Sequence, residues 1–238
     1  MARFLLIHGS AHGAWCWRDV LPALAARGHE VEAIDLPSNG ADATPPPEVG
    51  LQSYVDAILA AACEPVIAVA HSMSGVPMTQ AADLEPGRFA RLVYLCSYIP
   101  LDGHGVAAMR RAGPSQPLLP AIRRNPDGIT MGFDPAMVRN LFYHDCSDEA
   151  VAFAEAHLCP QAIRPQEEPV SLSGRAEALP RSYIVCSEDR AIPPEYQRQM
   201  ARALPPEDVF ELPLSHSPFL ADPAGLARLL DRIARAGG

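Results

Sequence analysis

A serine set between small residues is the first feature of the sequence that could do chemistry. Ser72 follows the apolar run of residues 66 to 70 and precedes a stretch able to be helical. A strand that turns sharply into a helix at a serine exposes the hydroxyl at the end of the sheet, where it can act as a nucleophile. This turn usually reads G-x-S-x-G, and here Ala70 and Ser74 replace the glycines. Both are small enough for the turn, although Ser72 or Ser74 could instead cap the helix.

A serine hydroxyl needs a general base, and the base needs an acid that orients it. In a parallel α/β sheet the carboxyl ends of the strands converge on one crevice, and the usual chain order is serine, acid, histidine. Of the eight histidines, only His216 comes shortly after the last expected strand. His71 adjoins Ser72, but its side chain should leave the backbone in another direction. We predict that His216 is the base, with an ordinary loop histidine as the alternative.

The acid should follow one of the strands that come after the nucleophile. Glu188 and Asp189 follow residues 182 to 186, and Asp102 follows residues 92 to 96. We favour Asp189, because an aspartate two or three residues past a strand end can turn back toward the crevice. A surface salt bridge is the alternative role for all three carboxylates.

A loop with two glycines follows the first expected strand, residues 4 to 8. Gly9 and Gly13 let the backbone approach a ligand closely, so that its N–H groups could form an oxyanion hole. A phosphate-binding loop is the alternative, but the sequence has neither G-x-G-x-x-G nor a Walker-type lysine. The loop therefore favours acyl chemistry.

The elements that position these residues follow from the hydrophobic pattern, in which short apolar runs alternate with stretches of helical periodicity. The expected strands are residues 4–8, 30–34, 66–70, 92–96, 182–186 and 209–212. The expected helices are residues 17–24, 51–63, 76–84, 194–204 and 226–233. The alternation predicts a single α/β domain over residues 1–238, with a mostly parallel, doubly wound sheet.

The alternation lapses between about residues 100 and 180. The segment is rich in proline and contains helical stretches near residues 135–142 and 148–157. It is too long for a plain loop, so we expect an inserted helical cap. Apolar cap residues could shape an acyl pocket or simply pack within the cap. The candidate substrate contacts of the cap are Met109, Phe133 and Phe142.

Composition narrows the class of protein. The chain has 238 residues, of which 48% are hydrophobic and 20% charged, as in ordinary globular proteins. A net charge of -9 without a basic stripe argues against nucleic-acid binding. No apolar stretch is long enough to span a membrane, and the N-terminal one is too short for a signal peptide. The six cysteines lack C-x-x-C pairs, which favours reduced thiols in a cytoplasmic protein without a metal site.

Taken together, these motifs resemble the α/β-hydrolase superfamily, and within it the branch of plant methylesterases, hydroxynitrile lyases and related bacterial carboxylesterases. The resemblance rests on residues 8–17, 70–75, 186–189 and 215–216 and covers nearly the whole chain. It implies a triad of Ser72, Asp189 and His216, with an oxyanion hole formed by the backbone N–H groups of Ser10 and Met73. Further candidate substrate contacts are Gly9 and His12.

Two positions in the sequence distinguish the lyases of this branch from its esterases. The lyases carry a threonine where Gly9 stands and a lysine after the catalytic histidine, where this chain has Ser217. Without that ammonium group to stabilise departing cyanide, we expect a carboxylesterase for small esters, methyl or aryl esters included. It would form an acyl-enzyme on Ser72 and need no cofactor, and it could form a homodimer. A carbon–carbon bond lyase and a slow-turnover small-molecule receptor stay open as alternatives.

Overall fold

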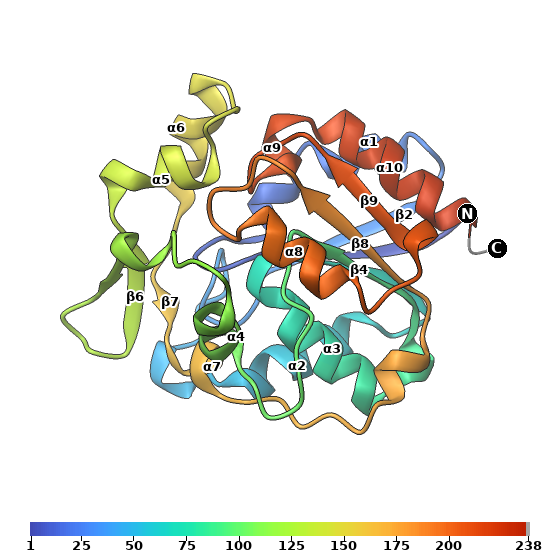
Figure 1. Ribbon diagram of the computed structural model, residues 1–238, viewed down its shortest axis with the longest axis horizontal. Coiled ribbons are helices and arrows are strands. Elements are labelled where there is room, and N and C mark those ends of the chain that lie inside the picture. The colour runs from blue at the N-terminus through green and yellow to red at the C-terminus, as the bar shows by residue number, and fades with distance from the viewer. Residues whose placement is uncertain (237–238) are drawn as a thin grey trace.

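The computed structural model describes residues 1–236 and is built on a six-stranded sheet of strand order β2-β1-β3-β4-β8-β9 (Figure 1). Every neighbouring pair of strands is parallel. The strands are β1 (Arg3–Ile7), β2 (Glu30–Ile34), β3 (Val66–His71), β4 (Phe89–Leu95), β8 (Arg181–Cys186) and β9 (Val209–Leu212). All residues of β3 are buried, which explains the apolar sequence of residues 66–70. The predicted parallel α/β fold is confirmed.

Helices cover both faces of this sheet (Figure 1). One face carries α1 (Val20–Ala25), α9 (Pro218–Ala221) and α10 (Pro223–Ala236). The other face carries α2 (Leu51–Ala61), α3 (Gly75–Leu84) and α8 (Pro194–Ala201). Each face therefore has its own apolar core, as a doubly wound sheet requires. Among residues 1–236, no helix combines the length and the apolarity needed to cross a membrane.

The chain between β4 and β8 leaves the sheet and forms a layer beside it (Figure 1). Its helices are α4 (Val106–Ala112), α5 (Pro135–Phe142), α6 (Asp148–His157) and α7 (Arg164–Glu167). It also holds a small antiparallel sheet of β5 (Ile122–Arg124), β6 (Thr130–Phe133) and β7 (Gln161–Ala162). The sequence pattern does not predict this sheet, because strands of two to four residues are too short to show an alternation of apolar and polar residues.

Strained backbone gathers where three neighbouring strands end. Ala11 beyond β1, Ser72 beyond β3 and Cys96 beyond β4 have φ angles of 60°, 57° and 36°. This left-handed region is costly for residues other than glycine, and proteins keep such strain mainly where function needs it. The carboxyl edge of the sheet is therefore the place to look for a site.

Candidate active site

Ser72, His216 and Asp189 contact one another in series beyond the ends of β3, β9 and β8. The Nδ1 atom of His216 lies 2.6 Å from Oδ2 of Asp189, and its Nε2 atom lies 3.0 Å from Oγ of Ser72. A carboxylate can only accept, so Nδ1 carries the proton and Nε2 presents its lone pair to the hydroxyl. All three residues are less than 10% exposed. The structure thus brings together the three residues that the sequence analysis selected.

The backbone at Ser72 has the strand–turn–helix geometry expected of a nucleophile elbow. Its positive φ angle starts a single helical turn (Ser72–Ser74) that runs into α3. The Ser72 carbonyl oxygen accepts hydrogen bonds from Oγ of Ser97 at 2.5 Å and from the backbone N–H of Tyr98 at 3.1 Å. These bonds hold the strained peptide in place, which leaves the hydroxyl facing the imidazole.

The two departures from G-x-S-x-G are accommodated. Ala70 is fully buried in β3, where it pairs with Ile7 of β1. The Oγ of Ser74 is also fully buried and donates to the carbonyl oxygen of His8, so this side chain ties the elbow to the end of β1. The position that requires glycine is Gly75, where a Cβ atom would overlap the backbone of Tyr98.

Asp189 has its oxygens filled by donors. Oδ1 accepts from the backbone N–H groups of Ala191 at 2.6 Å and Ile192 at 2.9 Å. Oδ2 accepts from Nε2 of Gln197 at 2.8 Å and from His216. These donors fix the orientation of the carboxylate, which can in turn orient the imidazole of His216. Gln197 escaped the sequence analysis, because a glutamine inside a helix carries no motif.

The two competing carboxylates lie elsewhere. Glu188 is exposed to solvent, and so is Asp102, whose Oδ1 accepts from the backbone N–H of Leu172 at 2.8 Å. Neither makes a hydrogen bond to His216, so the geometry favours Asp189 as the acid.

His71 makes no hydrogen bond to the Ser72 hydroxyl, but it does contact His216. Its Nε2 donates to the backbone carbonyl oxygen of His216 at 2.8 Å. Burial, reinforced by the neighbouring histidines, lowers the pKa of His71 well below 6.5, so the ring is neutral. A Cβ atom on Gly9 would lie only 2.6 Å from Nδ1 of His71, which explains the glycine. Nothing in the local sequence pattern indicates this contact of His71 with His216.

His12 is held on both sides of its ring. Nδ1 donates to the carbonyl oxygen of Ser10 at 2.8 Å, and Nε2 accepts from the Tyr143 hydroxyl at 2.7 Å. Burial lowers the pKa of His12 to about 3, which keeps this neutral tautomer in place. Because both nitrogens are engaged, we propose that His12 shapes the glycine loop rather than contacting substrate.

One cap residue ties together the two segments expected to form the oxyanion hole. Nε2 of Gln166, in α7, donates to Oγ of Ser10 at 2.9 Å and to Sδ of Met73 at 2.8 Å. Gln161 supports the same loop, since its Oε1 accepts from the backbone N–H of Ala11 at 3.0 Å. Neither glutamine stands out in the sequence, because each forms these hydrogen bonds with residues more than 90 positions away in the chain.

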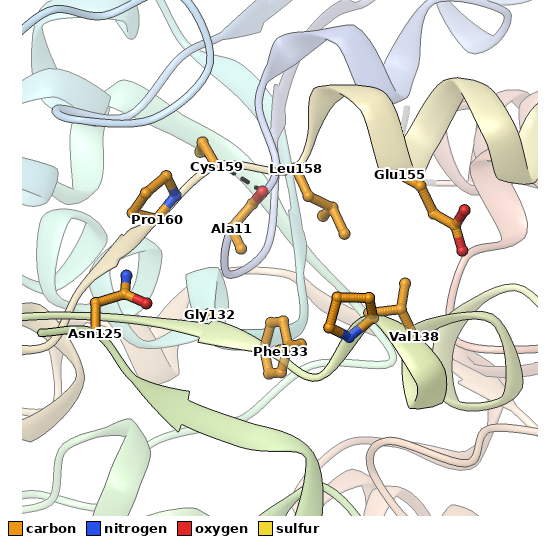
Figure 2. Close-up of a pocket in the computed structure, with 10 residues that line it drawn as sticks. Ala11, Asn125, Gly132, Phe133, Val138, Glu155, Leu158, Cys159 and Pro160 are labelled. Atoms are coloured by element: carbon orange, nitrogen blue, oxygen red, sulfur yellow. Dashed lines mark hydrogen bonds between the residues drawn. The ribbon is translucent and has the colours of Figure 1, made fainter.

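A cavity of about 270 Å³ opens between the glycine loop and the cap (Figure 2). Ala11 lies on one side and Phe133 on another. The ring of Phe133 packs 4.9 Å from that of Phe142, which in turn lies 5.6 Å from the imidazole of His216. Met109 is different: it belongs to the core on the α2 and α3 side of the sheet. The structure therefore places Phe142 beside His216 with Phe133 next to it, and it places Met109 in the core cluster that also holds Met73.

Within residues 1–236, one group of side chains has spacing compatible with a metal ion. Ligand atoms of His71, Cys96 and His216 lie within 4.8 Å of one another. Both ring nitrogens of His216 already serve Asp189 and Ser72, so this arrangement fits the triad better than a cation.

The chain belongs to the alpha/beta hydrolase family, whose model matches residues 4–229. Methylesterase 7 from Arabidopsis thaliana is 30% identical, over 98% of this chain and 96% of its own. Salicylic acid-binding protein 2 from Nicotiana tabacum is 28% identical, over 97% and 96%. The solved structure of a pyrethroid hydrolase from Sphingobium faniae JZ-2 is 30% identical and superposes with a TM-score of 0.86, covering 99% of this chain and 98% of its own. The predicted superfamily and methylesterase branch are confirmed.

Proposed function

We propose that this protein is a serine carboxylesterase that hydrolyses small carboxylic esters through an acyl-enzyme on Ser72. It is a carboxylic ester hydrolase, as its family and its similarity to a methylesterase and a pyrethroid hydrolase support. The observation that carries the serine mechanism is the unbroken hydrogen-bond series from Asp189 through His216 to the Ser72 hydroxyl.

The first half of the reaction forms the acyl-enzyme. Nε2 of His216 takes the proton from Ser72 as Oγ attacks the ester carbonyl carbon, and Asp189 stabilises the resulting imidazolium. The backbone N–H groups of Ser10 and Met73 stabilise the oxyanion of the tetrahedral intermediate. His216 then donates its proton to the departing alcohol. In the second half, water attacks the acyl carbon with the same base, and the carboxylic acid leaves.

The substrate is a small-molecule ester with a compact acyl group. The cavity beside Ala11 and Phe133, at about 270 Å³, is slightly smaller than typical ligand pockets. Its apolar wall, with Phe142 behind it, suits a short aliphatic or single-ring aromatic acid. Methyl and aryl esters of such acids are therefore the first choice. We also propose a cytoplasmic location, because all six cysteines are unpaired thiols.

A slow-turnover receptor is the second candidate, because one relative is named as a binding protein. Such a receptor would bind a carboxylic acid tightly while it hydrolyses esters slowly. A lyase is less favoured, since position 9 has no room for a threonine side chain unless His71 moves.

A panel of p-nitrophenyl and methyl esters of increasing acyl length, assayed on the wild type and on Ser72→Ala, tests the proposal. We expect turnover that is highest for compact acyl groups and is lost in Ser72→Ala. Equal activity in both proteins would contradict the serine mechanism. Ligand-dependent thermal stabilisation without turnover would favour the receptor.

A further inference from the structure

Arg110 of α4 is an unpaired cation in the cap. It is partly buried, its Nε is buried without a hydrogen-bond partner, and no acceptor among residues 1–236 pairs with its guanidinium. Another cap arginine, Arg123, does form an ion pair, with Asp134 at 2.6 Å. A guanidinium has five donors and stays charged, so burying part of it without an acceptor is costly. The described part of the chain therefore supplies no anionic partner for Arg110.

Arg110 lines a cavity of about 110 Å³ enclosed by α4, α7 and the strands β5 and β6. Much of the wall is apolar, as at Met131, and its charged residues are Arg110, Arg124 and Glu167. Two guanidinium groups and one carboxylate leave this wall net positive. A water molecule takes up about 30 Å³ in the liquid, so the cavity has room for one carboxylate group. Arginine binds such a group through two parallel hydrogen bonds.

Two sets of contacts connect the surroundings of this cavity with the segment that carries Ser72. Gln166 lines it and also donates to Ser10 and Met73, the residues of the proposed oxyanion hole. In the other set, Tyr98 donates its backbone N–H to the Ser72 carbonyl oxygen, and the centroid of its ring lies 6.4 Å from that of Tyr196. The Tyr196 hydroxyl in turn donates to the carbonyl oxygen of Met109, the neighbour of Arg110. Gln166 therefore connects the wall of this cavity directly to the proposed oxyanion hole.

We propose that Arg110 binds a carboxylate that the substrate carries at a distance from the scissile ester bond. The preferred substrates are then esters with a free remote carboxylate, such as monoesters of dicarboxylic acids. This inference rests on the proposed esterase function and adds a substrate class to it. The ion pair forms when substrate binds and anchors one end of the molecule while Ser72 attacks the other, so its main effect is on KM.

The direct test compares kcat/KM for monomethyl succinate, glutarate and adipate with the values for the neutral dimethyl esters. The proteins are the wild type, Arg110→Gln, Arg110→Lys and the control Arg111→Gln, whose residue is exposed on the same helix. We expect the wild type to prefer the monoanion by about tenfold at the chain length that fits, as for hydrogen bonds to a charged group. Arg110→Gln should lose this preference through a higher KM, Arg110→Lys should keep part of it, and Arg111→Gln should keep all of it.

O-acetylglycolate, which carries its carboxylate on the alcohol side, provides a second arm. It is compared with its neutral methyl ester. A preference for O-acetylglycolate or for the monomethyl esters supports the inference and shows whether the anion lies on the alcohol or the acyl side of the scissile bond. An anion preference that is absent from the wild type, unchanged in Arg110→Gln, or lost equally in Arg111→Gln would overturn the inference.

Failure of the inference and failure of the esterase proposal give different results. Ser72-dependent hydrolysis of the dimethyl esters without any anion preference leaves the esterase standing and removes the role of Arg110. If no ester is hydrolysed, binding still decides: glutarate should raise the Tm of the wild type and of Arg111→Gln but not that of Arg110→Gln. An equal shift in all three proteins would overturn the inference.

Discussion

His71 donates a hydrogen bond to the backbone carbonyl oxygen of His216, so the residue before the proposed nucleophile holds the backbone of the proposed base. Two adjacent residues therefore contact His216: His71 binds its backbone, and the hydroxyl of Ser72 faces its ring. The position of the imidazole is therefore fixed from the elbow as well as from Asp189. Such positioning matters, since a misplaced base costs rate even when the nucleophile is intact.

Replacing His71 should lower kcat more than it raises KM. His71→Leu removes the donor to His216, and we expect kcat for a p-nitrophenyl ester to fall about tenfold or more. His71→Gln can place an amide N–H near the original donor and should recover much of the loss. Steady-state kinetics of both variants test this, and equal activity of Leu, Gln and wild-type proteins would show that the bond does not position the base.

Gln197 should act through Asp189. Gln197→Leu removes one of the donors to Oδ2, the oxygen that orients the imidazole, so we expect kcat to fall about tenfold with little change in KM. Gln199→Leu is the matched control, because Gln199 is exposed two residues further along α8. A comparable loss in both variants would mean that the effect comes from the helix rather than from the carboxylate.

Gln166 should matter for stabilisation of the oxyanion. Its amide ties Ser10 to Met73, so Gln166→Leu should loosen the two backbone donors and lower kcat. We expect a loss of about tenfold, less than the roughly hundredfold or greater cost of deleting an oxyanion donor outright. The informative readout is the affinity for a boronic acid or phosphonate mimic of the tetrahedral intermediate, which should weaken in parallel. Unchanged affinity for the mimic would contradict the role.

The parts of this arrangement that sequence could predict are those with a local pattern. The strands appear as apolar runs, and Ser72, Asp189 and His216 each follow a strand in the expected order. The supporting residues have no such pattern. His71 meets His216 across 145 positions and Gln166 meets Ser10 across 156, so only the folded chain brings them together. The small sheet of the cap could not be predicted for a related reason. Its strand β7 has only two residues, and it pairs with β6, from which the helices α5 and α6 separate it in the sequence.

Stability should fall on acidification because buried histidines resist protonation. Burial lowers the pKa of His8 to about 4 and that of His12 to about 3, against 6.5 for a free imidazole. Between those values the unfolded chain binds more protons than the folded one, so the free energy of unfolding decreases as pH drops below about 6.5. Each histidine contributes up to about 1.4 kcal/mol per pH unit in its window.

Urea unfolding at several pH values between about 7.5 and 5 measures this slope. His12→Gln should reduce the slope by the amount that corresponds to about one proton taken up on unfolding. His157→Gln, at an exposed position, should leave the slope unchanged. A free energy of unfolding that stays constant or rises on acidification would show that the buried imidazoles are not neutral in the folded state.

The most direct test of the account is covalent labelling of the nucleophile. The protein is incubated with a p-nitrophenyl phosphonate, and the intact mass and the labelled peptide are determined for wild type, Ser72→Ala and His216→Ala. We predict one adduct per wild-type chain, located on Ser72, no adduct in Ser72→Ala, and very slow labelling in His216→Ala. Rapid labelling of another residue, or equal labelling of Ser72→Ala, would contradict the claim that Ser72 is the nucleophile activated by His216.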